Sequence, residues 1–250
     1  SKQGIAVRET LLRDYEIAEI SLFADKVFRY GESESAVVMG RRLKGPSRPF
    51  SVRYQRIREG QIAEFSRTYQ PGSAQIMDSE RFLRSGSPSL FVPELESVWH
   101  ALPTLPTLGE FAIVGQGLSH TKAVAGTAPR ESSKPREGME PGYATWDEEQ
   151  MTHTSPRIVW LSLAPDDIDR PRHGATKGVA QILLNYARIS REAWRVKALL
   201  DPQGHPVTSD FLVVRPQSAS LPLEVVWGIC NSPVANAYAY CHSTKRHVLA

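Results

Sequence analysis

Apolar and polar residues alternate at residues 15–23 and again at 35–43, which predicts two β-strands that each bury one face. Residues 8–14, directly before the first strand, are predicted to be the end of a helix. The two strands can form a hairpin, but a two-stranded hairpin is not stable alone in water. We therefore expect further strands that precede residue 1, so that the chain is a fragment of a longer protein.

The middle of the chain is divided by Pro and Gly residues. Residues 46–72 are polar and basic and are predicted to be a connector that contains a partly alternating strand. Residues 108–114 are predicted to begin a new domain, in which a strand runs into a turn at Gly115-Gln116-Gly117. Residues 127–150 show no apolar periodicity and are predicted to be a loop. The other predicted elements are a strand at 50–57, short helices at 78–84 and 94–102, and a buried strand at 157–163.

The C-terminal part of the chain contains a predicted basic hairpin. Residues 181–189 and 193–200 form its two strands, residues 201–204 make a turn, and residues 211–215 form a third strand. In the second strand Arg195 and Lys197 share one face, which is the alternation of a half-buried edge strand.

Two helices are predicted to follow the hairpin. Ser220 is the expected N-cap of the first helix, Asn231 ends it, and Ser232 and Pro233 begin the second. Apolar residues at helical spacing predict the buried face of each helix. They are Leu223, Val226, Trp227 and Cys230 in the first helix, and Val234, Ala237 and Tyr238 in the second.

The composition limits the class of protein. The chain has 250 residues, 41% hydrophobic and 23% charged, which is ordinary for a globular protein. No apolar run reaches the roughly 18 residues of a membrane-spanning helix, so we expect a cytoplasmic protein without a membrane partner. Two cysteines without a C-x-x-C pair favour a reducing compartment and argue against zinc. The aspartates at 166, 167 and 169 lack the glycine and glutamate of a calcium loop, so no metal is expected.

The positive charges are clustered although the net charge is only +3. Every charged residue between 35 and 58 is basic, and clustered cations can neutralise DNA phosphates independently of the base sequence. The alternative is an ordinary solvated surface. The cluster consists of Arg41, Arg42, Lys44, Arg48, Arg53, Arg56 and Arg58.

A second set of residues is predicted to read or contact DNA, with surface charge as the alternative. Arg recognises guanine, Asn recognises adenine, and aromatic rings such as those of Tyr186 and Trp194 stack on bases. The set comprises Asn185, Arg188, Arg191, Trp194, Arg195 and Lys197 in the hairpin, Gln116, Ser119, His120 and Lys122 after the Gly-x-Gly turn, and Lys245 and Arg246 near the C-terminus.

Two stretches resemble a known family. Residues 8–44, which contain LLRDYEIAEISLFADKVFRYGESESAVVMGRRLK, resemble the last helix and β-hairpin of the catalytic domain of adenine-N6 DNA methyltransferases from restriction-modification systems. Residues 181–250, which contain LPLEVVWGICNSPVANAYAY, resemble the target-recognition domains of these enzymes and of type I specificity subunits. The resemblance implies that Phe28, after Val27, stacks on the adenine swung out of the duplex. The alternative is a phenylalanine packed in the core.

The motifs for methyl transfer are missing. The family binds S-adenosylmethionine through a glycine-rich loop and holds the target amino group with an Asn-Pro-Pro-Tyr or Asn-Pro-Pro-Phe tetrad, and neither occurs here. Asn231-Ser232-Pro233-Val234 lacks the second proline and the aromatic residue. We therefore expect no cofactor and no catalytic residue in this chain, and Phe28 is a candidate only for stacking on the target base. S-adenosylmethionine would belong to the parent enzyme, and the partners would be double-stranded DNA and an N-terminal methyltransferase domain.

These features predict an α+β fold in which the closing β-hairpin of a Rossmann-like methyltransferase sheet precedes a mixed α/β target-recognition domain. Residues 1–44 would end the catalytic domain, 45–104 would form a basic connector with short helices, and 105–250 would recognise DNA. The alternative is a non-catalytic specificity or scaffold subunit that recruits a separate methyltransferase. A methyltransferase domain encoded upstream in the same reading frame would decide between them. A hydrolase is disfavoured because no G-x-S-x-G motif occurs.

Overall fold

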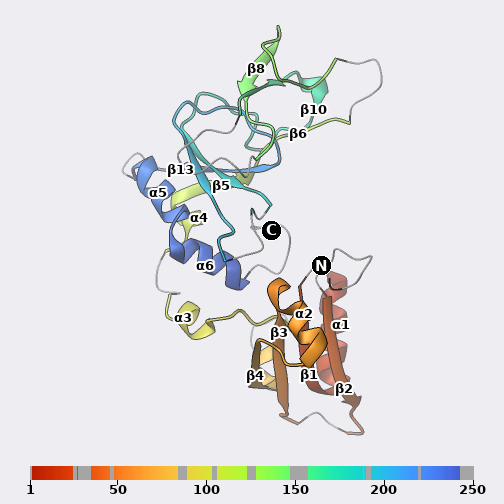
Figure 1. Cartoon of the computed structure of the whole chain (residues 1–250). Helices are drawn as coiled ribbons and strands as arrows, with labels where there is room; N and C mark the ends of the chain where they lie inside the picture. Colours follow the sequence, from red (N-terminus) through yellow and green to blue (C-terminus); the bar gives the residue numbers. More distant parts are fainter. Residues whose placement is uncertain are drawn as a thin grey trace. The chain divides into compact units, whose positions relative to one another are not determined.

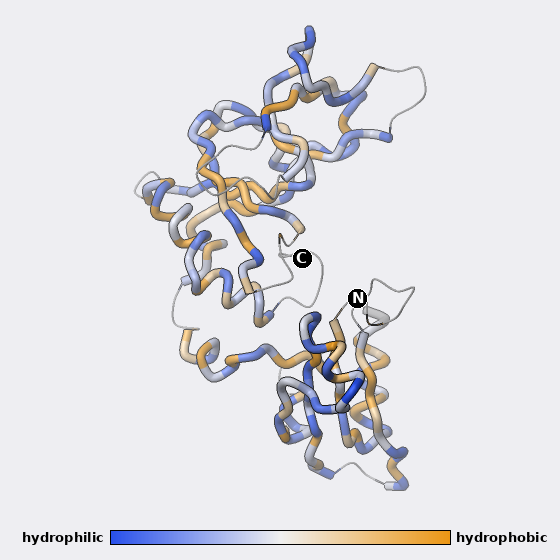
Figure 2. Tube along the Cα trace, viewed as in Figure 1, coloured by the Kyte–Doolittle hydropathy of each residue, from blue (hydrophilic) through white to orange (hydrophobic). Residues whose placement is uncertain are grey.

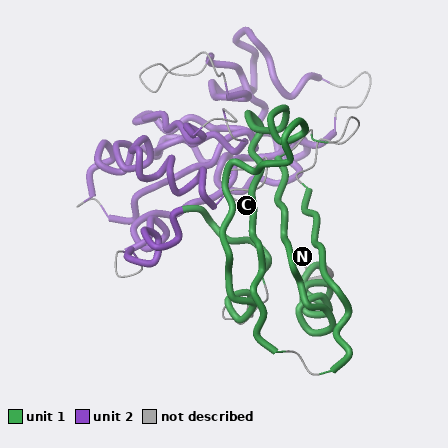
Figure 3. Tube along the Cα trace, turned by 60° about the horizontal axis from the view of Figure 1, so that its bottom comes forward, with its two compact units in different colours: residues 1–94 green, residues 95–250 purple. Residues whose placement is uncertain are grey.

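The computed structural model describes residues 2–24, 27, 35–45, 48–83, 89–102, 106–122, 128–146, 157–187, 189, 193–218 and 221–242. The chain divides into two compact units, unit 1 from Ser1 to Glu94 and unit 2 from Leu95 to Ala250 (Figure 3). The chain combines several sheets with a few helices, so the predicted mixed α+β class is confirmed. None of the helices in the described part of the chain has the length and apolar character that crossing a bilayer requires.

Unit 1 is built on a four-stranded sheet with the strand order β2-β1-β3-β4. β1 is antiparallel to β2, with an irregularity between Ile17 and Glu19, and parallel to β3. Apolar side chains of α1, the sheet and the segment after β4 form one core, which includes Leu12, Ile20 and Phe82. The elements are α1 (Lys2–Asp14), β1 (Tyr15–Phe23), β2 (Ser35–Arg42), β3 (Ser51–Ile57), η1 (Glu59–Gln61), α2 (Ile62–Thr68), β4 (Ser73–Asp78) and η2 (Ser79–Leu83).

The predicted helix end and both strands of the first hairpin are confirmed, but their surroundings differ from the prediction. β1 pairs with β2 on one side and with β3 on the other. The strands that complete this pairing therefore follow the hairpin in the sequence, and the prediction that they precede residue 1 is wrong for β1. Residues 45–104, expected to be a connector, contribute β3 and β4 to the sheet.

Unit 2 contains a four-stranded antiparallel sheet with the order β12-β11-β13-β5 (Figure 1). Its strands are β5 (Ala112–Gln116), β11 (Gln181–Asn185), β12 (Ala198–Asp201) and β13 (Phe211–Pro216). Ile182 and Leu184 face α5 (Leu223–Cys230) and α6 (Pro233–His242), whereas Leu183 faces a second cluster around Tyr143. Both faces of β11 are therefore buried, and the strands at the centre of unit 2 are strongly hydrophobic (Figure 2).

Smaller sheets extend unit 2. A three-stranded sheet has the order β7-β9-β8, and β6 pairs with β10. The prediction of a plain loop at 127–150 is wrong, because this stretch contains β7 and β8, and both pair with the correctly predicted strand β9. The remaining elements are α3 (Glu96–His100), α4 (Leu108–Phe111), β6 (Ser119–His120), β7 (Glu131–Ser132), β8 (Met139–Gly142), β9 (Val159–Ser162), η3 (Pro165–Asp167) and β10 (Ile168–Arg170).

The predicted helix pair exists, but the buried face of α6 differs from the prediction. Asn231 is the C-cap of α5, as predicted, whereas the N-cap of α5 is Pro222; Ser220 lies outside the described residues. Val234 is 62% exposed and Tyr238 is 53% exposed. The buried residues of α6 are instead Asn236, Ala239 and Cys241. A polar residue occupies this face because its amide binds a neighbouring backbone, as described below.

Candidate nucleic-acid interface

Two of the segments predicted to contact DNA leave the same end of the β12-β11-β13-β5 sheet. The strand register pairs Asn185 at the end of β11 with Phe211, and pairs Gln116 at the end of β5 with Leu212. Segments 117–122 and 186–197 therefore start at the same end of the sheet. The turn at 208–210, which leads into β13, lies between their starting points. We call the described residues of these three segments, together with Gln116, Arg170 and Arg172, the sheet-end surface.

Hydrogen bonds fix the middle of this surface. The amide of Tyr186 donates to the Asp210 carbonyl at 2.9 Å, and the side chain Nε2 of Gln116 donates to the Ser209 carbonyl at 3.0 Å. Burial, together with the negative charge of Glu131, raises the pKa of the Asp210 carboxyl. The turn before β13 therefore links the two predicted DNA-contacting segments directly.

Asn185 has a structural role instead of the predicted role in reading adenine. It is 1% exposed, and its Nδ2 donates to the carbonyls of Ala187 at 2.6 Å and Arg195 at 2.8 Å. Its Oδ1 accepts the amide N–H of Lys197 at 2.8 Å. The amide group is thus engaged with the protein backbone, so we correct the prediction for this residue.

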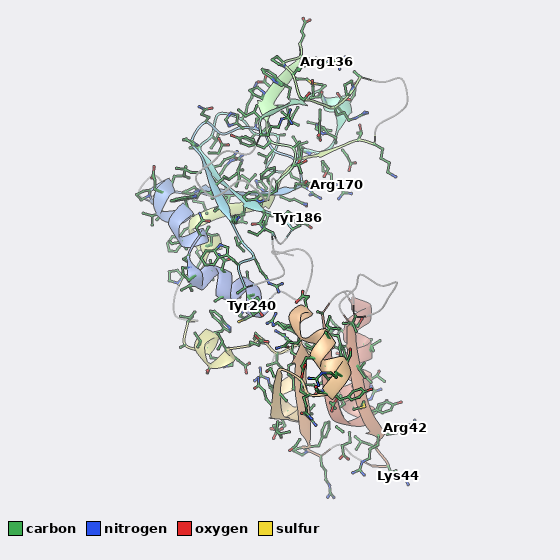
Figure 4. The ribbon with its side chains drawn as sticks, in the orientation of Figure 1. Arg42, Lys44, Arg136, Arg170, Tyr186 and Tyr240 are labelled. Carbon is green, nitrogen blue, oxygen red and sulfur yellow. The ribbon has the colours of Figure 1, made fainter. Side chains whose placement is uncertain are left out.

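Arg195 is also buried, which corrects its predicted place on the exposed face of a strand. It is 1% exposed, and its guanidinium lies 4.8 Å from the ring centroid of Tyr240 on α6, which is labelled in Figure 4. β12 begins only at Ala198, so the segment before it does not alternate as a strand. Trp194 is 43% exposed, and Lys197 is partly exposed, so both remain candidates for DNA contact.

The segment after β5 presents a mixture of buried and exposed groups. The side chain Nε2 of His120 lies 3.0 Å from the Ser162 carbonyl oxygen, and its Nδ1 lies 3.7 Å from Glu131. The interaction with the Glu131 carboxylate is the main reason why the pKa of His120 is raised, and burial opposes it. His120 therefore joins β6 to neighbouring strands, whereas Lys122 is exposed and Ser119 is partly exposed.

Two arginines beside this segment were missed by sequence reasoning. Arg172 is exposed and donates to Oε1 of Gln116, and Arg170 pairs with Ser119 in the β6–β10 register. Arg170 also forms an ion pair with Asp169 at 3.2 Å. The basic run at 170–173, Arg-Pro-Arg-His, was the sequence signal that could have identified them.

The glycines of the Gly-x-Gly motif serve close packing, which differs from the predicted freedom of a turn. A Cβ at Gly117 would lie 1.9 Å from the Thr208 carbonyl oxygen, and a Cβ at Gly115 would lie 1.8 Å from His173. Neither glycine has a positive φ. This motif therefore allows segments 115–117, 173–174 and 207–208 to approach each other.

The basic cluster of unit 1 is only partly available to a ligand. Arg42 and Lys44 are exposed at the end of β2 (Figure 4), and Arg48 and Arg53 are exposed as well. Arg41 is exposed but forms an ion pair with Glu16 at 2.8 Å. The prediction is corrected for two members, because the side chains of Arg56 and Arg58 are 8% and 15% exposed and both pair with Glu94.

Several predicted site residues lie outside the described part of the chain. They are Phe28, Arg188, Arg191, Lys245 and Arg246. Cys230 and Cys241 are buried and form no disulfide, and burial raises the pKa of Cys230 to about 11. In the described ranges no group of three or more His, Cys, Asp and Glu side chains is placed to hold a metal ion.

Comparisons with known proteins give little information about this chain. No family model matches it, and no curated protein sequence matches it. Among solved structures, it is similar to the type IIG restriction endonuclease BpuSI, with a TM-score of 0.40 and 10% sequence identity. The match covers 99% of this chain and 37% of that enzyme, so the chain spans less than half of its length. A similarity this low does not carry an argument about function.

Proposed function

We propose that this chain binds double-stranded DNA and serves as the recognition part of an adenine-N6 DNA methyltransferase of a restriction-modification system. The observation that carries the DNA-binding proposal is the shared origin of two independently predicted segments, 117–122 and 186–197, at one end of a rigid sheet. Loops that project from a rigid scaffold are suited to recognition. The methyltransferase assignment is supported by the resemblance of residues 8–44 and 181–250.

The chemistry of the sheet-end surface fits a nucleic acid. Arg172 and Arg170 supply exposed cations beside Gln116 and Ser119, Lys122 is an exposed cation at the end of segment 117–122, and Trp194 supplies an exposed aromatic ring. Cations bind phosphates, and an aromatic ring stacks on bases or packs against the groove. In this proposal the sheet-end surface reads the sequence.

Unit 1 contributes a different kind of contact in this proposal. Arg42, Lys44, Arg48 and Arg53 are exposed cations without a base-reading amide or aromatic residue among them. Such a group is suited to phosphates and gives affinity that depends strongly on salt concentration. We therefore assign general DNA affinity to this cluster.

In this proposal S-adenosylmethionine is bound outside this chain, because the sequence lacks the glycine-rich loop that would bind it. In a nucleotide-binding sheet a glycine-rich loop follows a parallel strand, but the turn after β3 reads Arg58-Glu59-Gly60-Gln61. The amide N–H of Arg58 is already bound by Oε1 of Gln61 at 3.1 Å. Methyl transfer therefore belongs, in this proposal, to a separate domain.

Duplex binding by the full chain at several salt concentrations tests the proposal. We expect binding that weakens as salt rises, and we expect Arg42→Ala to reduce the slope of log K against log salt by about 0.9 for one lost phosphate contact. Lys122→Ala is expected to weaken binding in the same assay. Arg67→Ala is the matched control, because Arg67 is an exposed arginine that pairs with Glu64 within α2 at 2.7 Å. Absence of duplex binding at low salt would contradict the proposal.

A further inference from the structure

Three asparagine side chains bind four consecutive backbone amides at the base of the 186–197 segment. Asn236 Oδ1 accepts the N–H groups of Arg195 at 2.7 Å and Val196 at 2.8 Å. Asn185 Oδ1 accepts the N–H of Lys197 at 2.8 Å, and Asn231 Oδ1 accepts that of Ala198 at 2.9 Å. We call Asn185, Asn231 and Asn236 the asparagine clamp. They come from β11, from the end of α5 and from α6.

Asn231 occupies the place of a neighbouring strand at the outer edge of β12. β12 is the edge of its sheet, so its outward N–H and C=O groups need partners from another element. Asn231 supplies both, since its Nδ2 also donates to the Ala198 carbonyl at 3.0 Å, and the Trp227 indole donates to the same carbonyl at 2.8 Å. The helix pair therefore holds the edge strand through side chains.

The clamp also keeps the preceding residues out of the strand. Residues 193–200 alternate like a strand in sequence, yet β12 starts at Ala198. The N–H groups of Arg195 and Val196 both point to one side-chain oxygen, that of Asn236, which is a geometry that an alternating strand does not have. The sequence pattern of this segment favours a strand, whereas in the structure the contacts with Asn236 hold it in a conformation in which Arg195 is buried and Trp194 is exposed.

We propose that Asn236 is a positioning residue for sequence recognition, because it binds the backbone of Arg195 and Val196 and so fixes the conformation of residues 194–197 on the sheet-end surface. This inference rests on the proposed function. Asn236 is 2% exposed and does not contact DNA itself. Its role is to hold Trp194 and Lys197 in the arrangement that distinguishes one sequence from another.

The test compares two substitutions at one position in the full chain. Asn236→Asp keeps an oxygen that accepts both N–H groups, whereas Asn236→Leu has the same number of side-chain heavy atoms, branched at Cγ in the same way, and removes the acceptor. The two readouts are hydrogen exchange of the Arg195 and Val196 amides, and the ratio of affinities for a selected duplex and a scrambled duplex. Asn185→Asp, which keeps the acceptor for Lys197 and loses both donors, is used if Asn236→Leu does not fold.

We expect Asn236→Leu to accelerate exchange of both amides and to lower the affinity ratio by about tenfold, which corresponds to losing one base-pair preference, while scrambled-duplex affinity is kept. Asn236→Asp is expected to stay within about threefold of the parent. An unchanged ratio despite faster exchange would overturn the positioning role and leave the proposed function intact. Absence of duplex binding by the parent chain would overturn both.

Discussion

Arg53 and Arg56 lie on the same strand, β3, and the structure predicts opposite consequences for removing them. Arg53 is exposed. The Arg56 side chain is 8% exposed; its guanidinium donates to the Val92 carbonyl at 3.2 Å and lies 3.5 Å from Glu94. It also lies 4.9 Å from the ring centroid of Phe91. Arg56 therefore attaches the segment after η2 to the sheet.

The loss from Arg56→Ala can be worked from these contacts. A hydrogen bond from a charged donor contributes about 1.5–3 kcal/mol, and a partly desolvated cation–π contact contributes about 0.5–2 kcal/mol. Glu94 keeps its ion pair with Arg58 at 2.8 Å, so the carboxylate is not left without a cation. We expect the free energy of unfolding of unit 1 to fall by roughly 2–5 kcal/mol in Arg56→Ala. Arg53→Ala is expected to change it by less than about 0.5 kcal/mol.

Urea unfolding of the full chain, followed by circular dichroism, measures the stability of both variants. Duplex binding of the folded proteins at several salt concentrations then measures the phosphate contacts. Arg53→Ala should reduce the slope of log K against log salt by about 0.9, and Arg56→Ala should leave it unchanged. A stable Arg56→Ala protein with a reduced salt slope would refute the reasoning, because it would show that Arg56 contacts phosphate.

Three further predictions concern unit 2 and one control position in unit 1. Gly117→Ala places a Cβ 1.9 Å from a backbone carbonyl oxygen, so the urea midpoint should fall and the free energy of unfolding should decrease by roughly 1–3 kcal/mol. Gly60 has open space around it, so Gly60→Ala should leave the midpoint unchanged. Glu131 is the main cause of the raised pKa of His120, so protonation of His120 stabilises the fold. This stabilisation is fully present below the ordinary pKa of 6.5 and is lost as the pH rises through the folded-state pKa. The stability difference between the parent and His120→Gln should therefore shrink as the pH rises above 6.5, and a constant difference would contradict this. The buried Cys230 thiol has a pKa raised to about 11, so it should resist alkylation at about pH 8 until urea unfolds the protein. Mass spectrometry measures the extent of alkylation, and rapid labelling of the native protein would contradict this prediction.

Elements with a strong local pattern could be predicted from the sequence. The alternation at 15–23 and the continuous apolar run of β11 gave strands, and the helical spacing of Val226 and Cys230 gave α5 with its end at Asn231. These patterns are reliable because burial acts on residues within one element. β7 and β8 could not be predicted in this way. They are short and contain Pro and Gly, and pairing with β9 defines them.

The candidate site was predictable as a region but not residue by residue. The sequence indicated segments 116–122 and 185–197, and the strand register brings them to one sheet end. The sequence did not reveal that Asn185 and Arg195 are buried. Asn185 binds the Arg195 carbonyl and Arg195 binds Asn236 on α6, and a rule that uses only the spacing of apolar residues within one element does not detect such contacts. Asn236 was likewise not predicted to be on the buried face of α6, because it is polar and its backbone partners are on a distant segment.

Selection of duplexes from a randomised library by the full chain tests the central claim most directly. A recognition part of an adenine-N6 methyltransferase must enrich a defined motif that includes at least one fixed A·T pair, since the adenine to be modified belongs to the recognised sequence. We expect this enrichment for the parent chain and for Arg42→Ala, which removes a cation of unit 1, and we expect an altered or lost motif for Trp194→Ala. Absence of enrichment, or a motif composed of G·C pairs alone, would contradict the account.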